Sequence, residues 1–343
     1  MKNEQISVCI IGAGRAGMIH ARAIERIPGA RVVALADSDK TLCQAGGRQL
    51  GVKLLYDDYR KALADASVDA VIVATPTRLH HDIVVSAAQA GKHILCEKPM
   101  AMNVAQCTEM IQAAEENRVK LQIGFMRRFD EEFRRAKKAV QRGDIGEVVL
   151  VKSLTHGPST PKPWQYDVSG SNGPLAEVNS HDIDTLRWFT ESEFSRVYAI
   201  AGNYRCPEAR AEFPDFYDNV SLVASFANGM QGFIDGAVSV KYGYDARVEV
   251  LGTEGILFVG ELADGSVAVC RGRGEIARPA VSSWRNLFAE AYVAEDAAFV
   301  AAVREDTEPA VDGYDGMMAV KVVEAGNQSI REGRPVCLDK ETQ

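Results

Sequence analysis

The chain has 343 residues, of which 46% are hydrophobic and 25% charged, as is typical of a globular protein with a large buried core. Lys and Arg total 39 against 47 for Asp and Glu, and the net charge of −8 argues against nonspecific binding to nucleic acid or anionic membranes. The seven cysteines form no C-x-x-C pair, which indicates a reducing compartment, and no stretch of about 18 consecutive apolar residues occurs. We therefore expect a cytoplasmic protein of two domains, with neither nucleic acid nor membrane as a partner.

The first 125 residues alternate short apolar segments with longer amphipathic ones. The apolar segments are VCIIG (8–12), RVVALAD (31–37), DAVIVAT (69–75), HILCE (93–97) and KLQIGF (120–125). Near-continuous apolar strands that alternate with helices are typical of βαβ units in a parallel sheet covered on both faces. The sequence thus predicts a doubly wound, Rossmann-type α/β domain over residues 1–125.

The first of these strands leads into a glycine-rich turn. Gly12, Gly14 and Gly17 follow the pattern G-x-G-x-x-G, which permits a tight turn, close approach to a pyrophosphate and close helix packing. Asp37 ends the next strand, where a carboxylate accepts hydrogen bonds from ribose hydroxyls and repels a 2′-phosphate. We predict a dinucleotide site here and not a purely structural turn, with NAD favoured and NADP as the alternative, since a serine and a lysine follow. Its residues would be Gly12, Gly14, Arg15, Ala16 and Asp37.

Two later strands end in residues suited to a ligand site, because ligands of such sheets bind at the carboxyl ends of the strands. Thr75 and Pro76 follow one strand and are expected beside the nicotinamide ribose, with His80 facing the same cleft. The next strand ends in Glu97 and Lys98, which are also expected to line the cofactor site, and burying a lysine is costly. Lys98 forms either a strand-end ion pair with Glu97 or a contact with an alcohol and its proton beside the cofactor. We expect no metal, because the two adjacent histidines at 80–81 do not make the i, i+4 pair of a zinc site.

Long strand-like segments dominate after about residue 145. They are GEVVLVKSLTH (146–156), SRVYAIAGNY (195–204), NVSLVASFA (219–227), MQGFIDGAVSV (230–240), ARVEVLGT (246–253) and GILFVGEL (255–262). Asn228-Gly229 predicts a hairpin with a type I′ turn, and strands joined by tight turns are antiparallel. Two helices, roughly 284–304 and 312–332, close the chain. The sequence predicts a second, α+β domain over residues 126–343 with a large, mostly antiparallel, open-faced sheet.

The segment GPLAEVNSHDIDTLRWF (173–189) is predicted to form one helix. Glu177, His181 and Asp184 then fall at i, i+4 and i+7 and share one stripe of its surface. A carboxylate beside an imidazole is suited to acid–base chemistry, and a solvated helix face is the alternative explanation of the same pattern.

In combination, these segments resemble the Gfo/Idh/MocA family of NAD(P)-dependent oxidoreductases over nearly the whole chain. The matching stretches are GAGRAG (12–17), ATPTRLHHDIVVSAAQAGKHILCEKPMA (74–101), QIGFMRRFD (122–130), SHDIDTLRWF (180–189), YGYDARVEVLGTEG (242–255), AFVAAVRE (298–305) and SIREGRPV (329–336). Within the family, GFMRRFD and YGYD look most like the inositol dehydrogenases. The resemblance implies a reversible, NAD-dependent oxidation of a secondary hydroxyl of a cyclitol, sugar or glycoside. It also implies a homodimer or homotetramer formed through the C-terminal sheet.

The resemblance also implies roles for individual residues. Lys98 would bind the substrate hydroxyl and transfer its proton, and His181 would be the main acid–base group, tuned by Glu177 where many members carry aspartate. Pro99 matches a proline whose peptide bond is often cis in the family. Substrate contacts are implied for Asp184, Arg128, His156 and Tyr244, and Trp164 or Tyr166 in the loop 156–173 would suit stacking on a ring.

Two other functions fit the same sequence. A glycoside-processing enzyme would hold NAD tightly and recycle it within each turnover, so that no free NADH accumulates. A non-catalytic NAD-binding sensor would keep the fold, although it would not need both Lys98 and His181.

Overall fold

The computed structural model describes residues 5–338, and the chain forms two compact units. Unit 1 comprises residues 1–130 and 289–320, and unit 2 comprises residues 131–288 and 321–343. This division differs from the single boundary at residue 125 predicted from the sequence, because a late helix returns to unit 1. Among residues 5–338, no helix combines the length and the apolar character needed to cross a bilayer.

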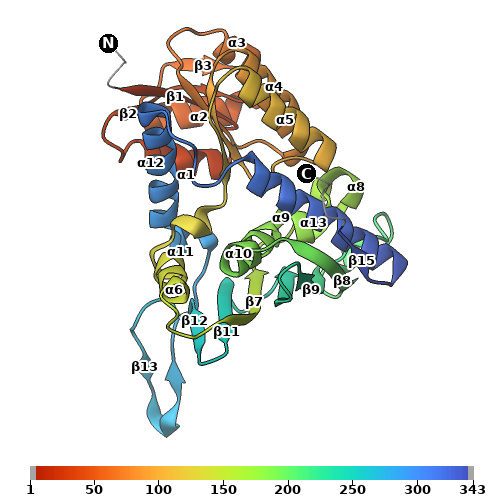
Figure 1. Ribbon diagram of the computed structural model, residues 1–343. Helices are drawn as coiled ribbons and strands as arrows, with labels where there is room; N and C mark the ends of the chain where they lie inside the picture. Colours follow the sequence, from red (N-terminus) through yellow and green to blue (C-terminus); the bar gives the residue numbers. More distant parts are fainter. Residues whose placement is uncertain (1–4, 339–343) are drawn as a thin grey trace. The chain divides into compact units, whose positions relative to one another are not determined.

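Unit 1 is built on a six-stranded parallel sheet in the order β3-β2-β1-β4-β5-β6 (Figure 1). The strands are β1 (Ile6–Ile11), β2 (Ala30–Ala36), β3 (Leu54–Tyr56), β4 (Ala70–Val73), β5 (His93–Glu97) and β6 (Leu121–Gly124). The predicted parallel domain is confirmed, and its apolar strands are the buried ones. The short edge strand β3 was not predicted, because its leucines are exposed and it has no long apolar run.

The helices of unit 1 are α1 (Arg15–Ile24), α2 (Lys40–Leu50), α3 (Tyr59–Leu63), α4 (His80–Gln89), α5 (Val104–Glu116) and α12 (Ala289–Glu305), with 3-10 turns η1 (Thr77–Leu79) and η2 (Met126–Phe129). Helices α4 and α5 lie side by side, and α1 lies against α12 (Figure 1). Phe299 and Val300 of α12 are fully buried in the same hydrophobic core as Ile10 and Ile24. This packing assigns α12 to unit 1, although it lies far from the other helices in the sequence.

Unit 2 contains a seven-stranded sheet in the order β12-β11-β7-β10-β9-β8-β15. Its strands are β7 (Val148–Gly157), β8 (Phe194–Gly202), β9 (Asn219–Phe226), β10 (Gln231–Val238), β11 (Asp245–Gly252), β12 (Ile256–Val259) and β15 (Val336–Cys337). The pair β7 and β10 is parallel and the other pairs are antiparallel, so the predicted mostly antiparallel sheet is confirmed.

Shorter elements complete unit 2. The helices are α6 (Glu131–Gln141), α7 (Pro163–Tyr166), α8 (Val168–Ser171), α9 (Gly173–Glu177), α10 (Ser180–Thr190), α11 (Trp284–Leu287) and the later part of α13 (Gly313–Glu332), with η3 (Pro207–Ala209) and η4 (Gly272–Gly274). A separate two-stranded hairpin consists of β13 (Val269–Cys270) and β14 (Ile276–Ala277).

Strands β9 and β10 form the hairpin expected at Asn228-Gly229, but its turn is not type I′. The Phe226 N–H donates to Met230 O and the Gly229 N–H donates to Phe226 O, both at 3.0 Å, so residues 227–229 form the loop. Of these three loop residues only Gly229 has a positive φ, at +87°, whereas type I′ requires two such residues. The loop is therefore a type I turn closed by a left-handed glycine.

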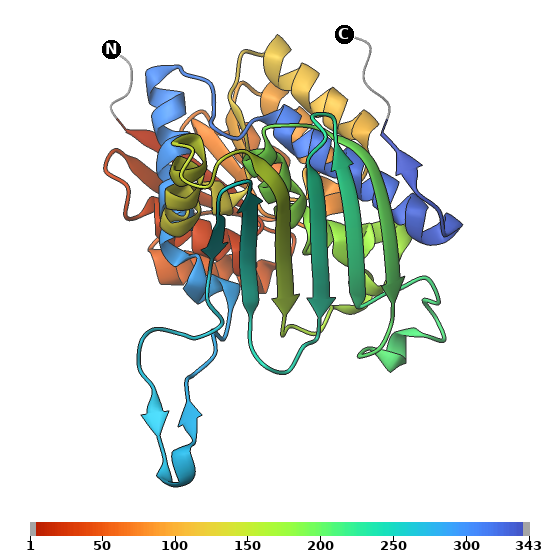
Figure 2. The ribbon, with the colours of Figure 1, turned by 60° about the horizontal axis from the view of Figure 1, so that its bottom comes forward.

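The two faces of the unit 2 sheet differ. Helices α9 and α10 cover one face, and the other carries no helix (Figure 2). Leu222 and Ile234 on the covered face are buried, while Ile200 and Val223 on the opposite face are about half exposed. We call the face that carries Ile200, Val223 and Lys152 the outer face.

Candidate active site

The turn between β1 and α1 has open space at one glycine and tight packing at two. A Cβ on Gly12, where φ is +102°, would lie 2.5 Å from Ala74 O, and one on Gly17 would lie 1.8 Å from Gly12 O. A Cβ on Gly14 would meet no atom within 4 Å. Gly14 is also the N-cap of α1 and brings no side chain to the N–H groups of its first turn, at Arg15 and Ala16. The turn therefore leaves room for an anionic group at the helix N-terminus.

Asp37 is fixed against this turn. Its Oδ2 accepts a hydrogen bond from the Ala13 N–H at 2.7 Å, and its Oδ1 accepts one from the Asp39 N–H at 2.8 Å. Each carboxylate oxygen keeps a further lone pair, so Asp37 can still accept hydrogen bonds from ribose hydroxyls. The arrangement fits the adenosine ribose expected from the sequence.

Thr75 and Pro76 follow the end of β4 after Ala74 and are half-buried. Thr75 Oγ1 is buried and has no hydrogen-bond partner among residues 5–338, so a bound group at this position would satisfy it. Close by, His80 is buried, with Nδ1 at 2.9 Å from Pro99 O and Nε2 at 2.9 Å from Thr75 O. Burial lowers the pKa of His80, so the neutral ring donates its one N–H to one of the two carbonyls. His80 thus supports the backbone at the end of β4, and its direct contact with a cofactor stays a prediction.

The end of β5 shows how the buried strand accommodates its charged residues. Glu97 is buried, and its Oε2 accepts the Lys98 backbone N–H at 3.0 Å while its Oε1 lies 3.2 Å from His20 Nε2. Lys98 is half-buried, and the Lys98–Pro99 peptide bond is cis, as the resemblance implied. Glu97 is therefore engaged with His20 and the backbone, and Lys98 follows it at the carboxyl end of the sheet.

Arg128 lies in η2, and its guanidinium is held in place. Its Nη1 and Nη2 donate to the two carboxylate oxygens of Asp315, at 3.0 and 2.8 Å. This two-bond geometry is typical of strong arginine–carboxylate pairs. The substrate contact inferred for Arg128 stays a prediction, and any such contact would be made by a guanidinium already fixed on one side.

The predicted single helix over 173–189 is wrong. Helix α9 ends at Glu177 and α10 begins at Ser180, and Asn179 between them leaves the helical region, with φ −86° and ψ 0°. The side chain of Asn179 is buried against β10, where a Cβ on Gly236 would lie 2.1 Å from Asn179 Oδ1. Because this packing breaks the helix, Glu177 does not precede His181 by one turn of a common helix. His181 and Asp184 do share α10, and both are buried.

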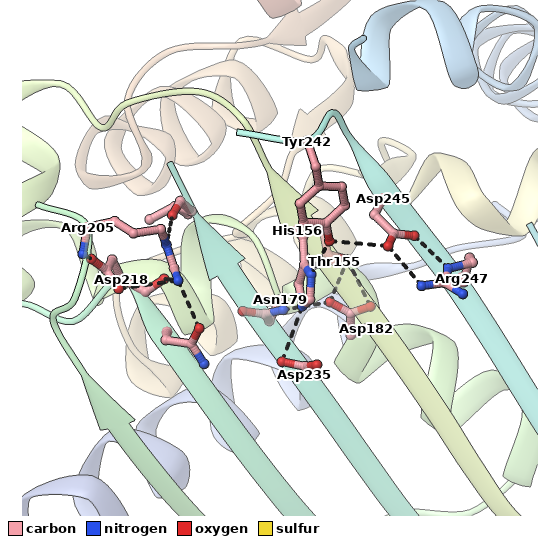
Figure 3. Close-up of polar contacts among 12 residues, drawn as sticks. Thr155, His156, Asn179, Asp182, Arg205, Asp218, Asp235, Tyr242, Asp245 and Arg247 are labelled. Carbon is pink, nitrogen blue, oxygen red and sulfur yellow. Dashed lines mark hydrogen bonds and ion pairs between the residues drawn. The ribbon is translucent and has the colours of Figure 1, made fainter. Parts of the chain in front are cut away.

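Asp182, beside His181, was not singled out from the sequence. Its carboxylate is fully buried and accepts hydrogen bonds from Thr155 Oγ1 at 2.7 and 2.9 Å and from Asn179 Nδ2 at 2.8 Å (Figure 3). It also accepts one from Ser153 Oγ at 2.5 Å. These bonds attach the first turn of α10 to strand β7. Ser153 and Thr155 stand at alternate positions of β7 and so share one face, which was the signal that a buried polar partner had to meet them.

The aromatic residues expected to contact substrate, Tyr244 from the resemblance and Trp164 or Tyr166 from the loop 156–173, have different environments. Tyr244 is buried edge-on against Phe288, with ring centroids 6.5 Å apart. Trp164 lies half-buried in α7. Tyr166 is packed in a small core, and its hydroxyl donates to Glu208 at 2.6 Å. Of the two aromatics considered for stacking, Tyr166 is occupied by core packing, and Trp164 remains the candidate.

His156 lies on the outer face of the unit 2 sheet. Its Nε2 is 3.2 Å from Asp235 Oδ1, and its Nδ1 makes a short contact with the Tyr242 hydroxyl (Figure 3). The preceding residue, Thr155, bonds Asp182 on the covered face, and side chains alternate along a strand. The structure therefore places His156 and α10 on opposite faces of the sheet, and its substrate contact stays a prediction.

Together, the open glycine turn, the Asp37 carboxylate against it and the buried hydroxyl of Thr75 fit a bound dinucleotide, which is the cofactor class of many oxidoreductases. Residues 6–125 match the family model described as "Oxidoreductase family, NAD-binding Rossmann fold", and residues 137–338 match its "C-terminal alpha/beta domain". The chain belongs to the Gfo/Idh/MocA oxidoreductase family, which confirms the resemblance. As a member it is a nicotinamide-dependent dehydrogenase acting on CH–OH groups.

Known relatives match over nearly the full length. The chain is 33% identical over 329 residues to inositol 2-dehydrogenase of Rhizobium meliloti, covering 96% of this chain and 98% of the relative. It is 32% identical over 336 residues to an uncharacterized oxidoreductase of Bacillus subtilis, covering 98% and 97%. Among solved structures, scyllo-inositol dehydrogenase from Lactobacillus casei with bound NAD(H) and scyllo-inositol has a TM-score of 0.88 and 26% identity, covering 97% of this chain and 99% of that one.

Proposed function

We propose that the chain reversibly oxidises a secondary hydroxyl of a cyclitol with NAD as the hydride acceptor, with sugars and glycosides as further candidate substrates. The observation that carries the proposal is the end of β5, where buried Glu97 holds the backbone of Lys98. In a parallel sheet this end lies at the same edge as the glycine turn after β1. Relatives that act on inositols support the cyclitol as the first substrate to test.

The proposed division of labour among the residues rests on the family resemblance. Bound nicotinamide would supply the hydride acceptor. Lys98 holds the reacting hydroxyl and takes its proton, and His181 passes the proton on as the main acid–base group. Asp184 binds a neighbouring hydroxyl, and Glu177 tunes His181 from the end of α9.

We further propose NAD as the preferred cofactor over NADP. The Asp37 carboxylate lies against the glycine turn, bonded to the Ala13 N–H, and would repel a 2′-phosphate on the adenosine ribose. Lys40, which could pair with such a phosphate, lies 3.6 Å from the carboxylate of Asp57.

Self-association through the outer face of the unit 2 sheet is also part of the proposal. Large apolar side chains are exposed on its strands, at Ile200, Val223, Leu251, Ile256 and Phe258. Burial of such a face in a dimer or tetramer would remove apolar surface from water. Sedimentation velocity of Val223→Asp should then show smaller particles than the parent protein, and an unchanged distribution would exclude this face.

The primary experiment follows NAD and NADP reduction by absorbance over a panel of inositols, aldoses, sugar acids, and O- and C-glycosides. NADH formation with inositols supports the proposal, and NADH formation only with glycosides or sugars moves the substrate to that class. No NADH from any compound, with nucleotide released on denaturation, would indicate internal recycling of NAD instead.

A matched pair of lysine variants tests the role of Lys98. Lys98→Met should lower kcat by about 10²- to 10⁴-fold, the usual contribution of a general acid–base group, with NAD affinity nearly unchanged. Lys53→Met, at an exposed position of the same unit, should keep full activity. Full activity of Lys98→Met would refute the assignment.

A further inference from the structure

A histidine outside the predicted site lies between two carboxylates in the interior of unit 1. His20 of α1 is fully buried, with Nδ1 at 2.8 Å from Asp296 Oδ1 and Nε2 at 3.2 Å from Glu97 Oε1. The edge of its ring packs against Tyr292, with ring centroids 5.2 Å apart at 85°. The imidazole is thus fixed through both nitrogens, by residues from α12 and from the end of β5.

The two carboxylates beside His20 favour its protonated form. Burial by itself lowers the pKa of His20, but the charges and hydrogen bonds of Asp296 and Glu97 outweigh it and raise that pKa well above its usual value. For Glu97, burial alone would raise the pKa, but the hydrogen bond and charge of His20 outweigh burial and lower the pKa of Glu97 below its usual value. An imidazolium with both N–H groups donating gives one oxygen of each carboxylate a charged partner. Burial nevertheless raises the pKa of Asp296, and the charge of His20 opposes that shift.

A metal ion is a second explanation for the same neighbourhood. His20, Glu295 and Asp296 bring three ligand atoms within 4.8 Å of one another. A histidine ligand must be neutral and offer a nitrogen lone pair, however, and both nitrogens of His20 already face carboxylates at hydrogen-bond distance. The geometry favours a hydrogen-bonded group over a metal site.

The second oxygen of Glu97 connects this group to Lys98. Glu97 Oε2 accepts the Lys98 backbone N–H at 3.0 Å, so a chain of hydrogen bonds runs from Asp296 through His20 and Glu97 to the backbone of Lys98. On another side, the carboxylate lies beside Gly124 of β6, where an added Cβ would come within 3.3 Å of Glu97 Oε2. The missing side chain of Gly124 thus leaves room for the Glu97 carboxylate next to β6.

We infer that His20 is a positioning residue for the dehydrogenase reaction: by holding Glu97, it fixes the backbone at Lys98 and with it the place of the reactive amine. The inference rests on the proposed role of Lys98. His20 itself touches neither substrate nor cofactor in this scheme, and Asp296 orients its ring.

Two substitutions at the same position separate positioning from stability. In His20→Gln the amide nitrogen replaces Nε2 and retains a donor toward Glu97, whereas in His20→Asn it replaces Nδ1 and retains a donor toward Asp296. Each variant loses one contact and the positive charge, so both should be destabilised. His20→Asn should lower kcat by roughly 10- to 100-fold with little change in KM, as small displacements of a reactive group do, and His20→Gln should retain more activity. Equal kcat values for the two variants, or parental kcat in His20→Asn, would overturn the inference.

A second readout needs no turnover. The acylation rate of the Lys98 amine is measured by peptide mass spectrometry under limiting reagent, with exposed Lys53 as the internal reference. The Lys98-to-Lys53 ratio should change in His20→Asn and less so in His20→Gln. If the parent protein oxidises nothing in the panel and this split is still seen, the proposed function fails while the positioning by His20 stands. If the parent protein oxidises a substrate of the panel but the two His20 variants show the same Lys98-to-Lys53 ratio, the positioning role of His20 is refuted and the proposed function stands.

Two further results decide the remaining cases. Elemental analysis of the purified protein that shows one equivalent of a divalent metal, lost in both His20 variants, would overturn the hydrogen-bonded group.

If neither His20 variant folds, Asp296→Asn keeps an oxygen for Nδ1 and removes only the charge. It should lower kcat with KM unchanged, and an unaltered kcat would refute the inference.

Discussion

Removal of the Asp182 carboxylate should destabilise unit 2 strongly. The carboxylate accepts hydrogen bonds from three donors, Ser153, Thr155 and Asn179, the Thr155 hydroxyl being shared between its two oxygens, and it is fully buried. A hydrogen bond to a charged group contributes about 1.5–3 kcal/mol. The two hydroxyls can turn toward other acceptors, so we count the equivalent of two bonds and expect Asp182→Ala to lower the free energy of unfolding by about 3–6 kcal/mol. The same change should loosen the first turn of α10, which carries His181.

Tryptophan fluorescence during urea unfolding measures this effect in unit 2 alone. The three tryptophans of the chain, Trp164, Trp188 and Trp284, all lie in that unit. Asp144→Ala, at an exposed site of the same unit, should change the unfolding free energy by less than about 0.5 kcal/mol and is the control. A loss below about 1 kcal/mol in Asp182→Ala, smaller than one charged hydrogen bond, would refute the reasoning.

Three further predictions concern unit 1. Gly17→Ala should lower the free energy of unfolding by more than about 3 kcal/mol, measured by thermal unfolding, because its Cβ would lie 1.8 Å from a backbone oxygen. Gly14→Ala should change the free energy of unfolding by no more than about 0.5 kcal/mol but weaken NAD binding, measured by fluorescence titration. Asp37→Ser should weaken NAD binding by roughly 10- to 100-fold, because hydrogen bonds to the ribose are lost. It should also reduce the preference for NAD over NADP, measured as the ratio of the two dissociation constants. An unchanged ratio would refute the role of the Asp37 charge. The hydrogen bond from Tyr56 to Asp65 raises the pKa of Tyr56 to about 12 and contributes to lowering that of Asp65 to about 2. A raised pKa means that the protonated tyrosine stabilises the folded state, fully so below the usual tyrosine pKa of about 10. Tyr56→Phe should therefore be less stable than the parent protein at pH 7. This difference in stability, measured by circular dichroism, should disappear as the pH rises through 12.

Local patterns in the sequence were sufficient for much of unit 1. The apolar segment 93–97 was predicted and observed with the same bounds as β5, and the glycine turn lies between β1 and α1 as expected. The hairpin at Asn228-Gly229 was also correct, although its turn type was not. These features depend on side-chain periodicity and turn preferences over a few residues, which a sequence displays directly.

The helix at 173–189 shows where local patterns fail. Its apolar spacing is helical throughout, yet the chain leaves the helix at 178–179. The cause lies elsewhere in the chain, in the space that Gly236 leaves for Asn179 and in the hydroxyls that bind Asp182. No spacing within the segment itself reports those partners.

The sequence by itself determined most of the strands of both sheets, the glycine turn, the position of Lys98 after a buried strand and the family. Only the tertiary structure decided that α12 belongs to unit 1, that His156 faces the outer side of its sheet, and that His20 meets Asp296, a partner 276 positions away. The physical reason is that helices and strands follow from hydrogen bonds and side-chain patterns between near neighbours, whereas the partner of a buried charge is chosen by which distant segments share the same interior.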